Sequence, residues 1–187
     1  MSELRALLFD LDGTLVDTLG ATATAYSRAL REYGVVVEPD EFSAISHGRQ
    51  WRDFLPEMLA RAGSTADPAS VARRKQAIYP ELLLGIRLNE PLITLAKSAR
   101  SVLRVGLVTT ASGAAVVAVL RQFKLTECFD VVVTGDDVAY HKPAPDAYLD
   151  ALERLGVAAS ACVAFEDSDA GIASARAAGV PVVRVAF

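Results

Sequence analysis

Cysteine, histidine and tryptophan are scarce in this sequence of 187 residues, which contains 2, 2 and 1 of them respectively. Cys128 and Cys162 are not in CxxC spacing, so neither a disulfide framework nor a zinc cluster is indicated. A long hydrophobic run is also lacking, because the apolar stretch near the N-terminus is far too short for a signal peptide or a membrane span. We therefore expect a cytoplasmic protein without a membrane partner.

Acidic residues only slightly outnumber basic ones. The 19 Lys and Arg residues against 23 Asp and Glu residues give a formal net charge of −4, which argues against binding to nucleic acid or anionic membranes. Hydrophobic residues make up 52% and charged residues 22%, which excludes intrinsic disorder. The length suits one domain with room for a modest appendage, and a monomer is the simplest expectation.

Short continuous apolar runs, each closed by turn residues, predict strands that are buried on both faces. The runs are 6–9, 105–108, 131–133, 162–165 and 182–185, and the helical stretches between the later ones are 113–123, 146–155 and 168–178. Strands and helices alternate strictly from about residue 90 onward. This alternation predicts an α/β fold, with a Rossmann-like parallel sheet flanked by helices and a ligand beyond the carboxyl ends of its strands.

Residues 17–84 interrupt this alternation with helical patterns. Ala23, Tyr26, Leu30 and Tyr33 are spaced by three and four residues, as in an amphipathic helix that Gly34 could end. The stretches 42–45, 51–59 and 71–84 also favour helix over strand. We therefore expect a core made of 1–16 and 85–187 and a helical cap domain made of 17–84, inserted where it would lie over the predicted site.

Polar side chains follow the first four predicted strands. They are Asp10 and Asp12 after the first, Thr109 after the second, Lys142 in the loop after the third, and Glu166 and Asp167 after the fourth. In a parallel sheet the carboxyl ends of the strands meet at one edge. The sequence therefore predicts that these side chains share one crevice.

The segments that carry these residues resemble the four motifs of the haloacid dehalogenase superfamily. They are Asp10-Leu11-Asp12-Gly13-Thr14-Leu15, Thr109, Lys142-Pro143-Ala144-Pro145-Asp146 and Glu166-Asp167-Ser168-Asp169-Ala170-Gly171. The resemblance spans residues 5–185, and the inserted helices look like the cap of the phosphoglycolate phosphatase and β-phosphoglucomutase branch. It implies the strand order 5-4-1-2-3 across the sheet.

The residue types suit transfer of a phosphoryl group from a small phosphorylated metabolite. A phosphomonoester carries about two negative charges near neutral pH, so carboxylates alone would repel it. A hard divalent cation removes this conflict, and Mg²⁺ prefers oxygen ligands in octahedral geometry. We expect Asp10 and Asp167 to supply carboxylate oxygens to Mg²⁺ and Asp12 to supply a backbone carbonyl.

The same residues divide the catalytic work. Asp10 can attack phosphorus and form an aspartyl-phosphate, while Asp12 would protonate the leaving oxygen and then activate the hydrolytic water. Lys142 and Thr109 would bind and stabilise the transferring phosphoryl oxygens. The predicted activity is hydrolysis of a small organic phosphomonoester.

Neighbouring polar residues are assigned less definitely. We expect either Glu166 or Asp169 to support the metal, directly or through its waters. Asp136 and Asp137 are interpreted as turn residues, and His141 as a loop residue. Aspartate is common in turns because its side chain hydrogen-bonds to nearby backbone groups.

In the insert, His47 and Arg49 are candidate substrate-binding residues because they lie on a turn that contains Gly48. An Arg side chain can bind an anionic group with two hydrogen bonds. Trp51, in contrast, is interpreted as a core aromatic of the cap. The sequence does not identify the phosphorylated substrate.

Other activities remain open. Phosphomutases that resemble this chain carry a histidine in the first cap helix, but the stretch 18–23 has none, so hydrolysis is favoured. Dehalogenases of the family lack the second aspartate, which is present here as Asp12. A phospho-accepting signalling domain without turnover is the alternative from another class, but such domains carry their acidic pair on the first strand and lack an insert at residue 17.

Overall fold

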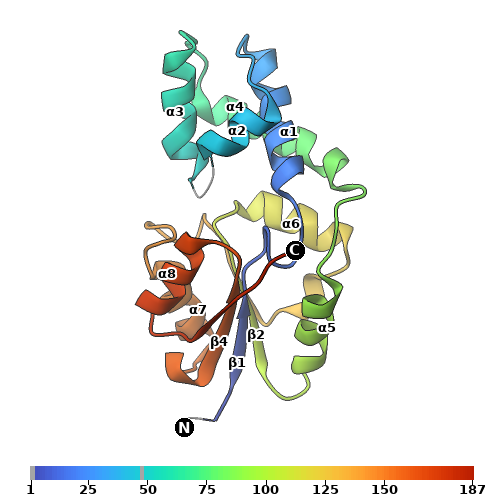
Figure 1. Cartoon of the computed structure of the whole chain (residues 1–187), viewed down its shortest axis with the longest axis vertical. Helices are drawn as coiled ribbons and strands as arrows, with labels where there is room; N and C mark the ends of the chain where they lie inside the picture. The colour runs from blue at the N-terminus through green and yellow to red at the C-terminus, as the bar shows by residue number, and fades with distance from the viewer. Residues whose placement is uncertain (1–2, 47–48) are drawn as a thin grey trace. The chain divides into compact units, whose positions relative to one another are not determined.

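The computed structural model of the chain describes residues 3–46 and 49–187 (Figure 1). The chain forms two compact units. One consists of Met1–Asp17 together with Arg87–Phe187, and the other consists of Thr18–Ile86. Among the described residues, no helix combines the length and apolar character needed to cross a membrane.

The first unit contains a parallel sheet. Its strands are β1 (Ala6–Phe9), β2 (Arg104–Val108), β3 (Val131–Val133), β4 (Cys162–Glu166) and β5 (Val182–Arg184). Their order across the sheet is β3-β2-β1-β4-β5, and every neighbouring pair is parallel. The predicted strand order is therefore confirmed, and the predicted apolar runs differ from the strands by at most a residue at an end.

Helices cover both faces of this sheet (Figure 1). Helices α7 (Asp146–Leu155) and α8 (Asp169–Ala177) pack together on one face, whereas α5 (Glu90–Ala99) and α6 (Gly113–Gln122) lie on the other. Short turns of 3₁₀ helix, η2 (Thr126–Cys128) and η3 (Ala159–Ala161), precede β3 and β4. The α/β prediction is thus confirmed.

The central strand explains why its sequence is continuously apolar. Every residue of β1 is buried, because side chains on alternate positions face opposite helical layers. On one face, Leu8 belongs to a core cluster that includes Tyr148 of α7. Phe9 stacks on the ring of Phe165 in β4, with centroids 4.9 Å apart. This packing fixes the strand ends from which the polar side chains emerge.

The second unit is helical. It comprises α1 (Leu19–Glu32), α2 (Pro39–Ser46), α3 (Trp51–Arg61), α4 (Pro68–Ile78) and the 3₁₀ helix η1 (Tyr79–Leu83). Gly34, with a φ of 77°, follows the end of α1 as predicted. The stretch 71–84, expected to be helix rather than strand, is helical up to Leu83, but it is divided because α4 ends before Pro80 and η1 continues it as a 3₁₀ helix. Proline lacks an N–H donor and disfavours helical backbone in the preceding residue.

Three aromatic rings form the centre of the helical unit. The rings of Tyr26 and Phe42 stack with centroids 4.9 Å apart, and Phe54 packs edge-on against both. Burial raises the pKa of Tyr26. Trp51, the aromatic expected in this core, is only half-buried and lies against the Arg52 guanidinium. The core therefore uses the aromatics on the inward faces of α1, α2 and α3 rather than the first residue of α3.

Candidate active site

Polar side chains gather at the carboxyl ends of β1 and β4. The backbone N–H of Asp10 donates to the carbonyl of Phe165 at 3.0 Å, which continues the sheet by one step and aligns Asp10 with the end of β4. One carboxylate oxygen from each of Asp10, Glu166 and Asp167 lies within 4.8 Å of the others. We refer to Asp10, Glu166 and Asp167 as the acidic cluster.

Lys142 joins this cluster from the loop between β3 and α7. Its Nζ donates to Asp10 Oδ1 at 2.8 Å, to Glu166 Oε1 at 2.5 Å and to the Val108 carbonyl at 2.9 Å. Only 6% of Lys142 is exposed. Burial by itself would lower the pKa of Lys142, but the charges of Asp10 and Glu166 outweigh it and raise that pKa. A lysine ammonium has three N–H donors, so all of them are engaged here.

Glu166 is completely buried, with 0% of the residue exposed. Burial, followed by the charge of Asp10, raises the pKa of Glu166 from 4.5 to about 7, although Lys142 and Tyr148 act in the opposite direction. Its Oε1 accepts hydrogen bonds from Lys142 and from the Tyr148 hydroxyl, the latter at 2.6 Å. Its Oε2 has no hydrogen-bond partner among the described residues.

The structure distinguishes Glu166 from Asp169, the two acidic residues of which the sequence predicts that one supports the metal. Glu166 is the last residue of β4 and points into the acidic cluster, whereas the side chain of Asp169 is exposed and pairs with Arg184. Tyr148 was not predicted as a site residue. In the sequence, Tyr148 is marked only by a hydroxyl on the apolar face of a predicted helix. That feature does not distinguish a site residue from an ordinary core aromatic.

The loop after β1 brings its backbone against the acidic cluster at Gly13. This residue has a φ of +84°, and a Cβ built there would lie 2.1 Å from Asp167 Oδ2. Glycine is therefore required both by the backbone conformation and by the close approach of the carboxylate. Asp12, just before it, is half-exposed. The Oγ1 of Thr14, just after it, is buried without a hydrogen-bond partner among the described residues.

The acidic cluster fits a hard divalent cation. Its carboxylates lie within reach of one ion, and oxygen ligands are those that Mg²⁺ and similar cations prefer. Buried polar atoms normally have partners, so the unpartnered Oε2 of Glu166 is expected to meet a ligand or its water. One lysine among three carboxylates also leaves an excess of negative charge that a cation would balance.

The remaining predicted residues lie as follows. Thr109, at the end of β2, is buried, and its Oγ1 accepts a hydrogen bond from the Ala111 N–H at 3.0 Å. Arg49 belongs to the helical unit and pairs with Glu57 at 2.9 Å. His47 lies outside the described residues. The structure thus brings together Asp10, Lys142 and Asp167.

The residues interpreted as turn residues make local contacts. Asp137 Oδ2 accepts hydrogen bonds from the N–H and the hydroxyl of Thr134, and Asp136 Oδ2 accepts one from the Gly113 N–H. The hydroxyl of Thr134 lies 2.6 Å from Asp137. These carboxylates stabilise the loop after β3 and are not members of the acidic cluster.

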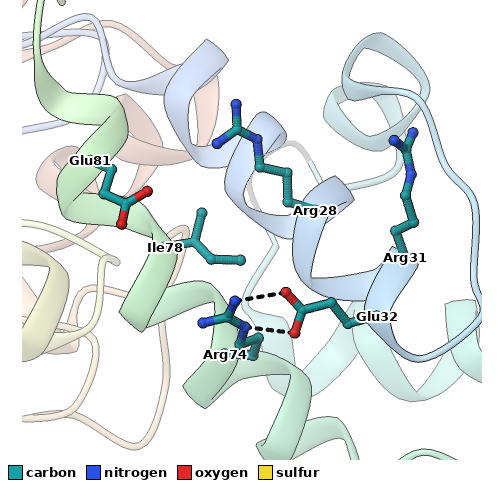
Figure 2. Close-up of a pocket in the computed structure, with 6 residues that line it drawn as sticks. All are labelled: Arg28, Arg31, Glu32, Arg74, Ile78 and Glu81. Atoms are coloured by element: carbon teal, nitrogen blue, oxygen red, sulfur yellow. Dashed lines mark hydrogen bonds and ion pairs between the residues drawn. The ribbon is translucent and has the colours of Figure 1, made fainter.

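A groove of about 370 Å³ lies within the helical unit (Figure 2). It is lined by Arg28, Arg31, Glu32, Arg74, Ile78 and Glu81. Two nitrogens of Arg74 donate to the two oxygens of Glu32 at 2.6 and 2.7 Å. The charged side chains around the groove are exposed, and ion pairs in water contribute little. The acidic cluster is therefore the candidate catalytic centre.

Comparisons with known proteins agree with this geometry. The haloacid dehalogenase-like hydrolase family matches residues 7–185. The chain is 36% identical over 181 residues to fructose-1-phosphate phosphatase YqaB of Escherichia coli (strain K12), which covers 96% of this chain and 95% of that protein. The structure of the present chain is similar to that of CbbY from Rhodobacter sphaeroides in complex with phosphate, with a TM-score of 0.90 and 29% identity. That match covers 98% of the present chain and 87% of the CbbY chain. A mutant of CbbY in complex with xylulose-(1,5)bisphosphate gives a TM-score of 0.87 at 29% identity over the same shares, 98% and 87%. The chain therefore belongs to the haloacid dehalogenase-like hydrolase family.

Proposed function

We propose that this protein is a Mg²⁺-dependent phosphatase that hydrolyses the phosphomonoester of a small sugar. The observation that carries the proposal is the direct contact between Asp10 Oδ1 and Lys142 Nζ beside Glu166 and Asp167. In this arrangement a carboxylate that could act as the nucleophile, a cation and a candidate metal-binding cluster lie close together, which supports the proposal. The relatives named above act on or bind phosphorylated sugars, which supports the substrate class.

The acidic cluster would hold the metal. Asp10 and Asp167 would supply carboxylate oxygens, Asp12 its backbone carbonyl, and Glu166 a further oxygen to the metal or to its water. When bound, Mg²⁺ would offset the negative charge of the phosphoryl group, which the carboxylates alone would repel.

The reaction has two displacements. An oxygen of Asp10 forms a bond to phosphorus as the bond from phosphorus to the sugar oxygen breaks, and Asp12 gives that oxygen a proton. Asp12 then takes a proton from water, whose oxygen attacks the phosphorus of the aspartyl-phosphate. The bond between phosphorus and Asp10 breaks, which releases inorganic phosphate and restores both carboxylic groups to their starting states.

Lys142 and Thr109 would bind the phosphoryl oxygens during both displacements. Because all three donors of Lys142 are engaged in the structure, one of them must change partner when substrate binds. The hydrogen bond to Asp10 is the natural one to exchange, since Asp10 becomes covalently linked to the phosphoryl group. The Thr109 hydroxyl accepts from the Ala111 N–H and retains its own hydrogen for donation.

The helical unit would act as a cap that selects the substrate, with Arg49 and His47 as its candidate readers. Arg49 already pairs with Glu57, so substrate binding would compete with this ion pair. We further propose that the protein works as a monomer, since each catalytic role is assigned within one chain.

A screen of phosphorylated sugars and sugar alcohols, read out as inorganic phosphate, tests the proposed function. We expect sustained Mg²⁺-dependent release that stops with EDTA and returns when Mg²⁺ is restored. Isomerisation of a sugar phosphate without phosphate release would indicate a phosphomutase instead. Labelling of the protein from a phosphodonor without repeated turnover would indicate a signalling domain. Turnover that EDTA leaves unchanged would contradict the metal role.

A further inference from the structure

Tyr148 touches the Lys142–Glu166 pair without carrying a charge. It lies near the start of α7, is completely buried, and donates its hydroxyl to Glu166 Oε1 at 2.6 Å. The Nζ of Lys142 lies 5.4 Å from the centre of the Tyr148 ring. A residue needed only to fill the core could be phenylalanine, so the hydroxyl calls for a separate explanation.

The contacts of Tyr148 determine how the Glu166 carboxylate is oriented. Tyr148 and Lys142 donate to the same oxygen, Oε1, while Oε2 accepts nothing among the described residues. Gly171 in the first turn of α8 also lies against the carboxylate, where a Cβ would come within 1.9 Å of Oε2 and 2.5 Å of Oε1. The terminal torsion of a glutamate is soft and roughly two-fold, so the side chain alone does not select this orientation.

We propose that Tyr148 is a positioning residue of the active site and that it acts through Glu166. Its hydroxyl holds Oε1 on the side of Lys142, and Gly171 provides the space that the carboxylate occupies. Oε2 is thereby kept available to the metal or to a metal-bound water. The inference rests on the proposed function for its catalytic meaning, but the orientation of Glu166 can be measured through metal binding alone.

Loss of the hydroxyl should release the carboxylate. In Tyr148→Phe, Glu166 Oε1 loses the hydrogen bond from Tyr148 and keeps the one from Lys142. The carboxylate can then rotate, while the aromatic ring still fills the core. Groups that orient metal-binding carboxylates typically contribute roughly 10–100-fold to metal affinity. We expect a loss of Mg²⁺ affinity at the low end of this range, so that Tyr148→Phe binds Mg²⁺ about tenfold more weakly than the wild type, with kcat reduced in parallel.

Calorimetric titration of the metal-free protein with Mg²⁺, without substrate, is the primary test. Thr134→Val is the matched control, because Thr134 also donates a hydroxyl to a carboxylate at 2.6 Å, that of Asp137, which lies outside the acidic cluster. We expect this variant to bind Mg²⁺ as the wild type does. Thermal unfolding of both variants separates a loss of stability from a loss of metal binding.

A double-mutant cycle identifies the route of the effect. If Tyr148 acts through Glu166, then adding Tyr148→Phe to Glu166→Gln should weaken Mg²⁺ binding by less than about twofold, because coupled residues are not additive. An equal loss in both backgrounds would overturn the proposal. So would wild-type Mg²⁺ affinity in Tyr148→Phe, since a purely structural tyrosine would change only the melting temperature. A wild-type protein that binds Mg²⁺ but hydrolyses no phosphomonoester would defeat the proposed function and leave this test intact.

Discussion

Replacement of Lys142 by methionine would remove the cation from between two buried carboxylates. The Nζ of Lys142 lies 2.8 Å from Asp10 and 2.5 Å from Glu166, and its side chain is almost completely buried. Methionine has a similar length and suits an apolar environment, so Lys142→Met removes the charge with little change in volume. What remains is a pair of carboxylates that repel each other in a poorly solvated site.

The expected loss of stability follows from this geometry. Removal of one member of a buried ion pair costs about 3–5 kcal/mol, because the remaining charge is desolvated without compensation. The loss should be largest at pH 8, which lies above the pKa of about 7 that Glu166 has beside Lys142. It should shrink at pH 5.5, because removal of Lys142 takes away a contact that lowers the pKa of Glu166 and so favours its neutral form.

Urea unfolding of metal-free protein in EDTA, followed by circular dichroism, measures this loss at both pH values. Lys97→Met serves as the control, because Lys97 is exposed on α5 and its replacement should change the free energy of unfolding by less than about 0.5 kcal/mol. A loss below about 1 kcal/mol for Lys142→Met at pH 8 would refute the buried-pair argument. An equal loss at both pH values would also refute it.

Three further predictions address other parts of the chain. In metal-free protein the pKa of Glu166 is raised from 4.5 to about 7, so the folded state binds a proton on Glu166 more tightly than the unfolded state does. The contribution of Glu166 to the free energy of unfolding should therefore fall by on the order of 3 kcal/mol as pH rises between these two values. Denaturant titrations of wild type and Glu166→Gln at several pH values measure this fall as a change in the difference between their free energies of unfolding. A difference that stays constant with pH would contradict the prediction. Gly13→Ala should displace Asp167 and weaken Mg²⁺ binding by about tenfold in calorimetry, whereas unchanged affinity would remove Gly13 from the site. Arg49→Ala should raise KM for the true substrate more than for p-nitrophenyl phosphate, and equal changes in both KM values would dispose of Arg49 as a substrate reader.

The sheet could be predicted from the sequence because its central strands are buried on both faces. The run at 6–9 coincides with the central strand β1, in which every residue is buried, and the run at 131–133 coincides with the half-buried edge strand β3. Both matches arise because turn residues close each run at the point where the strand ends. Alternation with helices implies parallel strands, and parallel strands bring their carboxyl ends to one edge. The proximity of Asp10 and Lys142, which are far apart in the sequence, follows from that topology.

Other features depend on contacts that the sequence does not encode locally. Glu166 and Asp169 are both acidic and only three positions apart, but one ends a strand and points inward while the other starts a helix and points outward. Tyr148 reaches Glu166 only because α7 packs across the sheet. Trp51 was predicted in the core of the helical unit, yet packing selected Phe42 and Phe54 instead.

The replacement of Asp10 by asparagine tests the central claim most directly. The amide preserves the shape of the side chain but cannot attack phosphorus, so Mg²⁺-supported release of phosphate should fall by more than about a thousandfold relative to wild type. In the same experiment, acid-quenched wild-type protein should carry a phosphoryl group on residue 10 by mass spectrometry, and the variant should not. Turnover by Asp10→Asn within about tenfold of wild type would contradict the account.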